Sequence, residues 1–167
     1  AMDYSMLLLV LLGCPLAAAL LIAALPAKST PRGAYEALHV LSLAGVAVAG
    51  LTLVVAAFAG SDIFALGEWF HLDGLSALFL GLIAVIAPCT GVYSLPYVAH
   101  DVAEGKLGPS QVKQYYAFFS LFVFSMILAV TSNNIIMMWV SVEATTLSTV
   151  FLVGVYRTKL ALSLIHI

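Results

Sequence analysis

The segment Met6–Leu25 reads MLLLVLLGCPLAAALLIAAL, and none of its 20 residues is charged. A helix of about 20 apolar residues is long enough to cross the roughly 30 Å hydrocarbon core of a bilayer. Four further segments have a similar character: Ala37–Ala59, Leu75–Leu95, Tyr115–Val130 (with Gln111 to Gln114 as an interfacial extension) and Asn134–Val155. The sequence therefore predicts an all-α polytopic transmembrane bundle with five spans.

The composition of the whole chain agrees with this prediction. Of its 167 residues 63% are hydrophobic and 8% are charged, the formal net charge is −2 and the mean hydropathy is +1.14. Soluble domains carry about 25% charged residues, so a soluble enzyme, a nucleic-acid binder and a disordered chain are excluded. Cys14 and Cys89 lie in apolar runs, and we interpret them as packing residues rather than as a disulfide or a metal pair.

Two residues mark the expected ends of the third span. Asp73 precedes the third span and is a residue type that caps helix N-termini, whereas Pro96 follows it and is expected to end it. The connection from Tyr97 to Gln114 is then expected to be a solvated loop with a short interfacial helix. A role in proton uptake for its residues His100 and Glu104 has no support in the sequence.

The basic residues predict the orientation of the bundle. All six fall in alternate connections or after the fifth span: Lys28, Arg32, Lys106, Lys113, Arg157 and Lys159. Since Lys and Arg accumulate on the cytoplasmic side, we expect a multi-pass protein of the cell (inner) membrane. Its N-terminus is expected outside and the end of the fifth span in the cytoplasm.

Glu143 is expected to be the only ionisable residue deep inside a span, near the middle of Asn134–Val155. A charged side chain at that depth costs about 2.5–3.5 kcal/mol on insertion scales. A carboxyl group lowers this cost by binding a proton, by pairing with a cation or by facing water. We therefore predict that Glu143 takes part in ion translocation. The alternative is a neutral, hydrogen-bonded glutamate that only locks helix packing.

The neighbours of Glu143 indicate close helix contacts. On a helical wheel Asn134, Ser141, Thr145 and Ser148 form one polar stripe, while Trp139 and Thr146 lie one turn from Glu143 on either side. The fifth span is therefore expected in the interior of a bundle, with Glu143 aimed at other helices or at a hydrated path. No Lys, Arg or His is assigned to the interior of the five spans. Glu143 then acts as a lone acid, or its partner lies on a segment that this chain lacks.

Several short motifs resemble the antiporter-like subunits of respiratory complex I, Mrp antiporters and group 4 NiFe-hydrogenases. They are Ser132-Asn133-Asn134, Trp139, Glu143-Ala144-Thr145-Thr146-Leu147, Leu152-Val153-Gly154 and Tyr156-Arg157, with Asp73-Gly74-Leu75-Ser76 and Tyr93 to Tyr97 around the third span. The form of the Glu143 motif is most similar to hydrogenase-4 component F and its formate hydrogenlyase relatives.

This resemblance implies a role for Glu143 and an incomplete chain. In the family the corresponding glutamate pairs with a lysine on the seventh helix and takes part in redox-driven proton transfer. Family subunits have about fourteen helices, so residues 1–161 correspond to the N-terminal five. The final residues 162–167 (LSLIHI) are expected to be an adapter-derived artefact.

The resemblance also implies partners. We expect a proton-translocating subunit that contacts lipid, binds no nucleic acid and belongs to a hydrogenase-4, formate hydrogenlyase or NADH:quinone oxidoreductase type complex. The oxidoreductase chemistry is assigned to that complex, and no cofactor or metal is expected in this chain, which has no Cys cluster. The alternatives are a Mrp-type cation/proton antiporter subunit, which needs no redox partner, and a structural membrane scaffold.

Overall fold

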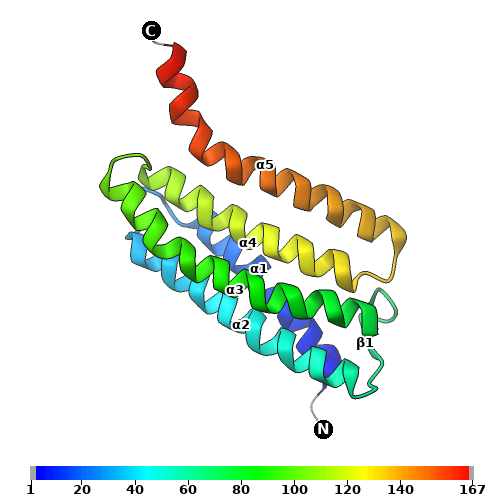
Figure 1. Cartoon of the computed structure of the whole chain (residues 1–167). Helices are drawn as coiled ribbons and strands as arrows, with labels where there is room; N and C mark the ends of the chain where they lie inside the picture. The colour runs from blue at the N-terminus through cyan, green and yellow to red at the C-terminus, as the bar shows by residue number, and fades with distance from the viewer. Residues whose placement is uncertain (1–2, 166–167) are drawn as a thin grey trace.

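The computed structural model describes the backbone of residues 3–165 and the side chains of residues 3–156. Five helices and one β-hairpin follow one another along the chain (Figure 1). Their bounds are α1 Tyr4–Ala24, α2 Arg32–Phe58, β1 Ile63–Ala65, β2 Phe70–Leu72, α3 Gly74–Ala103, α4 Pro109–Thr131 and α5 Ile135–Ile165. Within the described part, all five helices are long and apolar enough to cross a membrane, the fifth over Ile135–Tyr156. The predicted all-α bundle of five spans is confirmed.

Helix α4 lies at the centre of the bundle. It packs against α1, α3 and α5 and touches α2, while α2 also packs against α1 and α3. Helix α5 contacts chiefly α4, and it runs along the edge of the bundle in Figure 1. The core between the helices is built from aliphatic side chains with almost no exposed surface, including Leu8, Leu11, Val46, Leu53, Leu80, Val123 and Ile127.

Small residues allow α2 to approach its neighbours closely. A Cβ atom added to Gly50 would lie 2.9 Å from the Cβ of Ala84, and one added to Gly45 would lie 2.9 Å from the Sγ of Cys14. Such contacts are typical of helix pairs in membranes, where van der Waals packing replaces the hydrophobic effect. Cys14 therefore has the predicted packing role. Cys89 is exposed, so it has no packing role within the described residues.

The ends of α3 and α4 differ from the predicted bounds. Helix α3 continues through Pro96 to Ala103, and α4 begins at Pro109. The prediction that Pro96 ends the third span was wrong, because a proline removes only one backbone hydrogen bond and the helix can continue beyond it. The connection is therefore only residues 104–108. The predicted extension of the fourth span over Gln111 to Gln114 and the cap at Asp73 are both observed, since Ser76 N donates to Asp73 Oδ1 at 2.7 Å.

The hairpin between α2 and α3 was not predicted from the sequence. Its strands are antiparallel with Ile63 opposite Leu72, and the turn places Gly67 at φ +73°, a conformation that favours glycine. Ile63 and Leu72 are buried. A single β-bridge from Phe70 to Ser132 connects the hairpin to the α4–α5 connection. The α2–α3 and α4–α5 connections are thus in backbone contact at this end of the bundle.

Candidate functional site

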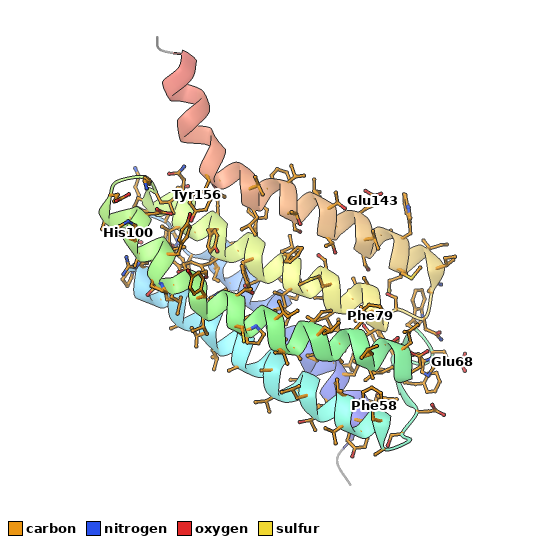
Figure 2. All side chains as sticks on the ribbon, viewed as in Figure 1. Phe58, Glu68, Phe79, His100, Glu143 and Tyr156 are labelled. Carbon is orange, nitrogen blue, oxygen red and sulfur yellow. The ribbon has the colours of Figure 1, made fainter. Side chains whose placement is uncertain are left out.

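Glu143 lies on the open face of α5. Its side chain is exposed, and in Figure 2 it points away from α4 and the rest of the bundle. On the same face Trp139, one turn earlier, is 63% exposed, and Thr146, one turn later, is also exposed. The prediction that the fifth span is interior was therefore wrong for the described helices. Periodicity shows which residues of a helix share a face, but it does not show which face the neighbouring helices cover.

The opposite face of α5 packs against α4. Ser141 and Ser148 have almost no exposed surface, and Thr145 is half-buried beside them. Ser141 and Ser148 therefore lie on the covered face of α5. Asn134, the fourth member of the stripe, is exposed and caps α5 instead, because its Oδ1 accepts a hydrogen bond from Ile136 N at 2.9 Å.

The hydroxyl groups near Glu143 bond within their own helix. Ser141 donates to the carbonyl of Met137 at 2.7 Å, Thr145 to that of Ser141 at 2.9 Å, and Thr146 to that of Val142 at 3.1 Å. These bonds satisfy the hydroxyl donors without a partner on another helix. Ser141 and Thr145 can therefore line a close helix contact, and none of the three donates a hydrogen bond to Glu143.

Glu143 has no cationic partner in the described part of the chain. The ion pairs found among residues 3–156 all lie near one end of the bundle, between Arg32 and Glu36 and within the cluster His100, Asp101, Glu104 and Lys106. The side chain of Arg157, which the sequence places about four turns further along the helix, is outside the described residues. The expectation that any partner of Glu143 comes from elsewhere is consistent with this arrangement.

His39 is a buried ionisable residue that the sequence analysis missed. It lies within α2 and within the predicted second span, so the assignment of no histidine to the spans was wrong. Its side chain has no exposed surface, and its ring packs 4.9 Å from that of Tyr116 and 4.8 Å from that of Phe119. Its Nε2 atom lies 3.3 Å from the carbonyl oxygen of Gly91 on α3. His39 is the third residue of the predicted span Ala37–Ala59, whereas helix α2 begins at Arg32, so the residue lies about two turns inside the helix.

The aromatic residues at the start of α4 pack against neighbouring helices. Tyr116 and Phe119 surround His39, while Phe118 stacks on Phe151 of α5 with ring centroids 5.1 Å apart. No haem or quinone site has to be invoked for these rings.

The α3–α4 connection holds an exposed ionic cluster. Glu104 accepts contacts from His100 Nε2 at 3.1 Å and from Lys106 Nζ at 2.5 Å. The Lys106 ammonium lowers the pKa of Glu104, and Glu104 in turn raises the pKa of Lys106. His100, Glu104 and Lys106 are exposed, so their contacts contribute little energy, whereas Asp101, whose Oδ1 lies 3.7 Å from Lys106 Nζ, is buried.

His71 and Asp73, at the hairpin end of the bundle, are likewise explained by local structure. His71 stacks on Phe64 across the hairpin with ring centroids 4.2 Å apart, and Asp73 caps α3. The backbone N–H of Ser76 holds the pKa of the Asp73 carboxyl below its usual value. Both residues lie at the end of the bundle that holds the hairpin.

Known proteins similar to this chain are membrane subunits of respiratory and hydrogenase complexes, although no family profile matches it. A protein named hydrogenase-4 component F homolog from Methylacidiphilum infernorum is 42% identical over 92 residues, which cover 55% of this chain and 19% of that protein. The chain's homologues are antiporter-like membrane subunits. They include two proteins named NADH-quinone oxidoreductase subunit L. The one from Escherichia coli is 29% identical over 140 residues (72% of this chain, 22% of that protein), and the one from Campylobacter jejuni is 32% identical over 85 residues (51% and 13%).

The antiporter-like homologues confirm the resemblance seen in the sequence motifs. Together with the five apolar helices, they show that the chain is a multi-pass membrane protein. The chain spans about a fifth of the length of the hydrogenase-4 and Escherichia coli relatives. Most of each of those proteins therefore lies outside the matched region.

Proposed function

We propose that this chain is part of a proton-translocating membrane subunit of a redox-driven complex, of the hydrogenase-4 or NADH:quinone oxidoreductase type. The observation that carries the proposal is the 42% identity to a protein named hydrogenase-4 component F homolog. Subunit L relatives belong to the same broad class. The redox chemistry is assigned to partner subunits in the membrane and in a peripheral arm, and this chain is proposed to bind no cofactor itself.

Glu143 is proposed to bind and release the translocated proton. Its carboxyl group projects from the open face of α5, near the middle of the membrane span Ile135–Tyr156. A carboxylate that faced lipid there would cost about 2.5–3.5 kcal/mol, so the ionised form of Glu143 needs a polar or charged partner. We propose that this partner is a cation on a segment outside the described residues. Movement of a proton on or off Glu143 would then strengthen or weaken the pair.

The residues around Glu143 are proposed to hold it in this position. Ser141 and Thr145 allow close packing of α5 on α4 and so direct the Glu143 face outward. Trp139 and Thr146 flank Glu143 on the open face, where they would border the proton path. Their contribution is to position and shield the carboxyl group, not to carry the proton.

The orientation of the bundle is proposed from its basic residues. The α1–α2 and α3–α4 connections, with the helix starts that follow them, contain Lys28, Arg32, Lys106 and Lys113, whereas the hairpin and residues 132–134 contain no Lys or Arg. By the positive-inside rule the basic end is cytoplasmic, and the N-terminus lies outside. We call this end the basic end below.

The test is redox-driven acidification of inverted membrane vesicles that contain the full-length subunit in its complex. Formate or hydrogen as the electron donor should drive acidification in the hydrogenase-4 case, and NADH in the other case. Deletion of the subunit's gene should abolish acidification, and complementation should restore it. Sodium/proton exchange without any electron donor would instead support the Mrp-type antiporter. Unchanged acidification after deletion would overturn the proposal.

A further inference from the structure

His39 has one ring nitrogen whose hydrogen-bonding role can be deduced. A backbone carbonyl can only accept, so the contact of 3.3 Å to Gly91 O requires that Nε2 carries the proton. In the neutral ring Nδ1 is then an acceptor. This atom is buried and has no hydrogen-bond partner among the described residues. Buried polar atoms nearly always have a partner, either from the protein or from water, and ionisable residues inside a membrane span mark ion-binding sites.

Tyr116 presents a second buried group of the same kind next to His39. Its side chain has no exposed surface, its ring centroid is 4.9 Å from that of His39, and its hydroxyl group is buried without a partner in the described part of the chain. Glu36 is one turn before His39 on α2, toward the basic end, and its side chain is 24% exposed. Glu36 is therefore a partly exposed ionisable group one turn from His39 along α2.

A cavity of about 170 Å³ lies at the basic end, on the side from which α2 and α4 start. Among the residues that line it are Arg32 and Tyr35 of α2 and Val112 of α4. Each lies four residues before a member of the group, since Arg32 precedes Glu36, Tyr35 precedes His39 and Val112 precedes Tyr116. Residues four apart share one helix face, so these three lining residues lie one helical turn from Glu36, His39 and Tyr116, toward the basic end. Its volume is sufficient for several waters at about 30 Å³ each.

We propose that His39 is a second proton-binding site in the membrane, loaded from this cavity through Glu36 and Tyr116. A proton from cavity water binds Nδ1 and forms the imidazolium, and its release restores the neutral ring, so no other reactant is needed. On α2 the charged groups on the basic-end side of His39 are Glu36 and Arg32, which pair with each other at 2.8 Å, and on α4 the ring of Tyr116 packs on His39. Helix α3 presents the carbonyl of Gly91 and the hydroxyl of Ser94, which already donates to that carbonyl at 2.7 Å.

The site differs from Glu143 in its place in the bundle. His39 lies in the core between α2, α3 and α4, whereas Glu143 is on the far face of α5. The assignment of His39 to transport rests on the proposed function, but access of water to His39 does not. The two statements can therefore be tested separately.

Access is tested by hydrogen–deuterium exchange at the imidazole C2 position, measured by mass spectrometry on the full-length subunit in its complex in nanodiscs. This exchange needs water and a ring that binds protons, and the exposed His100 of the same molecule serves as the reference. His39 should exchange measurably, and Tyr116→Phe should slow it several-fold without an effect on His100. The variant removes only a hydroxyl that forms no hydrogen bond, so the fold should be retained. Absence of exchange at His39 while His100 exchanges would overturn the proposal.

Transport is tested with His39→Gln, whose amide can still donate to Gly91 O but cannot bind a proton. Acidification of inverted vesicles should fall several-fold at unchanged abundance of the complex. Full acidification by this variant would overturn the role of His39 in transport. If wild-type vesicles show no redox-driven acidification either, the proposed function fails, and the exchange measurement still decides whether His39 is a proton site.

Discussion

His39 and Gly91 join α2 to α3 inside the bundle, with 3.3 Å between the imidazole Nε2 and the carbonyl oxygen. This close approach depends on the missing side chain of Gly91. A Cβ atom there would lie 2.1 Å from Cδ1 of Leu43 and 3.0 Å from Nε2 of His39. Both distances are shorter than ordinary van der Waals contacts, so any larger residue would push the two helices apart.

Gly91→Ala is therefore expected to destabilise the subunit. Overpacking of a well-packed core typically costs about 1–3 kcal/mol, and the substitution also disturbs the carbonyl that His39 and Ser94 share. Thermal denaturation of the full-length subunit in detergent should show a lower midpoint. Gly81→Ala is the matched control on the same helix, because its Cβ would meet only Val54 at 3.7 Å. The control should be neutral or stabilising, and an equal loss in both variants would contradict the packing argument.

Asn133 is expected to hold the hairpin against the α4–α5 connection. Its Nδ2 donates to the carbonyl of Glu68 at 2.9 Å, and its backbone N–H donates to that of Trp69 at 2.9 Å. Asn133→Ala removes only the first bond, so amide hydrogen exchange over residues 63–72 should become several-fold faster. Asn134→Ala is the neighbouring control. It removes the cap of α5 and should speed up exchange in the first turn of that helix alone. No change in the hairpin of the Asn133 variant would show that this bond does not restrain it.

The five spans were predictable because a span is a local property of length and hydropathy. The cap at Asp73 was predictable for a similar reason, since side-chain and backbone groups only three residues apart form it. The passage of α3 through Pro96 was not, because the outcome depends on how the surroundings satisfy one freed carbonyl. The hairpin was missed because each strand has only three residues and because its bridge to Ser132 joins distant parts of the chain.

The residues of the candidate site were predictable from the sequence, but the side of α5 on which Glu143 lies relative to the other helices was not. Glu143 stands out as an acid in an apolar run, and Ser141 and Ser148 stand out as small polar residues at helical spacing. Which face of α5 is covered depends on the helices present around it, and the described helices cover only the serine face. His39 could have been found from the sequence, because it falls within the predicted span Ala37–Ala59.

The cap at Asp73 predicts a pH dependence at the start of α3. The bond from Ser76 N favours the ionised carboxylate and lowers the folded-state pKa below the ordinary value of 3.8. A depressed pKa means that this stabilisation is fully present above the unfolded-state value and is lost as the pH falls through the folded-state value. Amide protection factors in the first turn of α3, corrected for intrinsic exchange rates, should fall over that acidic range. Asp73→Asn keeps a capping oxygen that does not titrate, so its protection should not change there; an identical fall in both proteins would remove Asp73 as the cause.

Cysteine labelling should report the orientation of the bundle. In a background with Cys14→Ser and Cys89→Ser, Ser110→Cys places a thiol at the exposed start of α4, and Asp62→Cys places one in the exposed connection before β1. If the basic end is cytoplasmic, an impermeant maleimide should label only position 62 in intact cells made permeable at the outer membrane. Position 110 should react with permeant reagents alone. The reverse pattern would invert the proposed orientation.

Replacement of Glu143 tests its role in the full-length subunit. Gln has nearly the same shape but cannot bind or release a proton, so Glu143→Gln should insert and assemble normally, because it removes the cost of a charge in the membrane. Proton translocation should fall several-fold, measured as acidification of inverted vesicles at matched abundance of the complex. Glu143→Asp should keep part of the activity, since the carboxyl group remains but is one methylene closer to the backbone.

Glu68→Gln is the matched control for this experiment, because Glu68 is exposed on the hairpin outside the spans. It removes the same charge from the same subunit and should leave translocation unchanged. The comparison therefore separates the loss of a titratable group on α5 from a general effect of net charge. Wild-type translocation by Glu143→Gln would assign Glu143 to packing. Because its side chain projects from the open face of α5, that packing would have to be against a segment beyond the described helices.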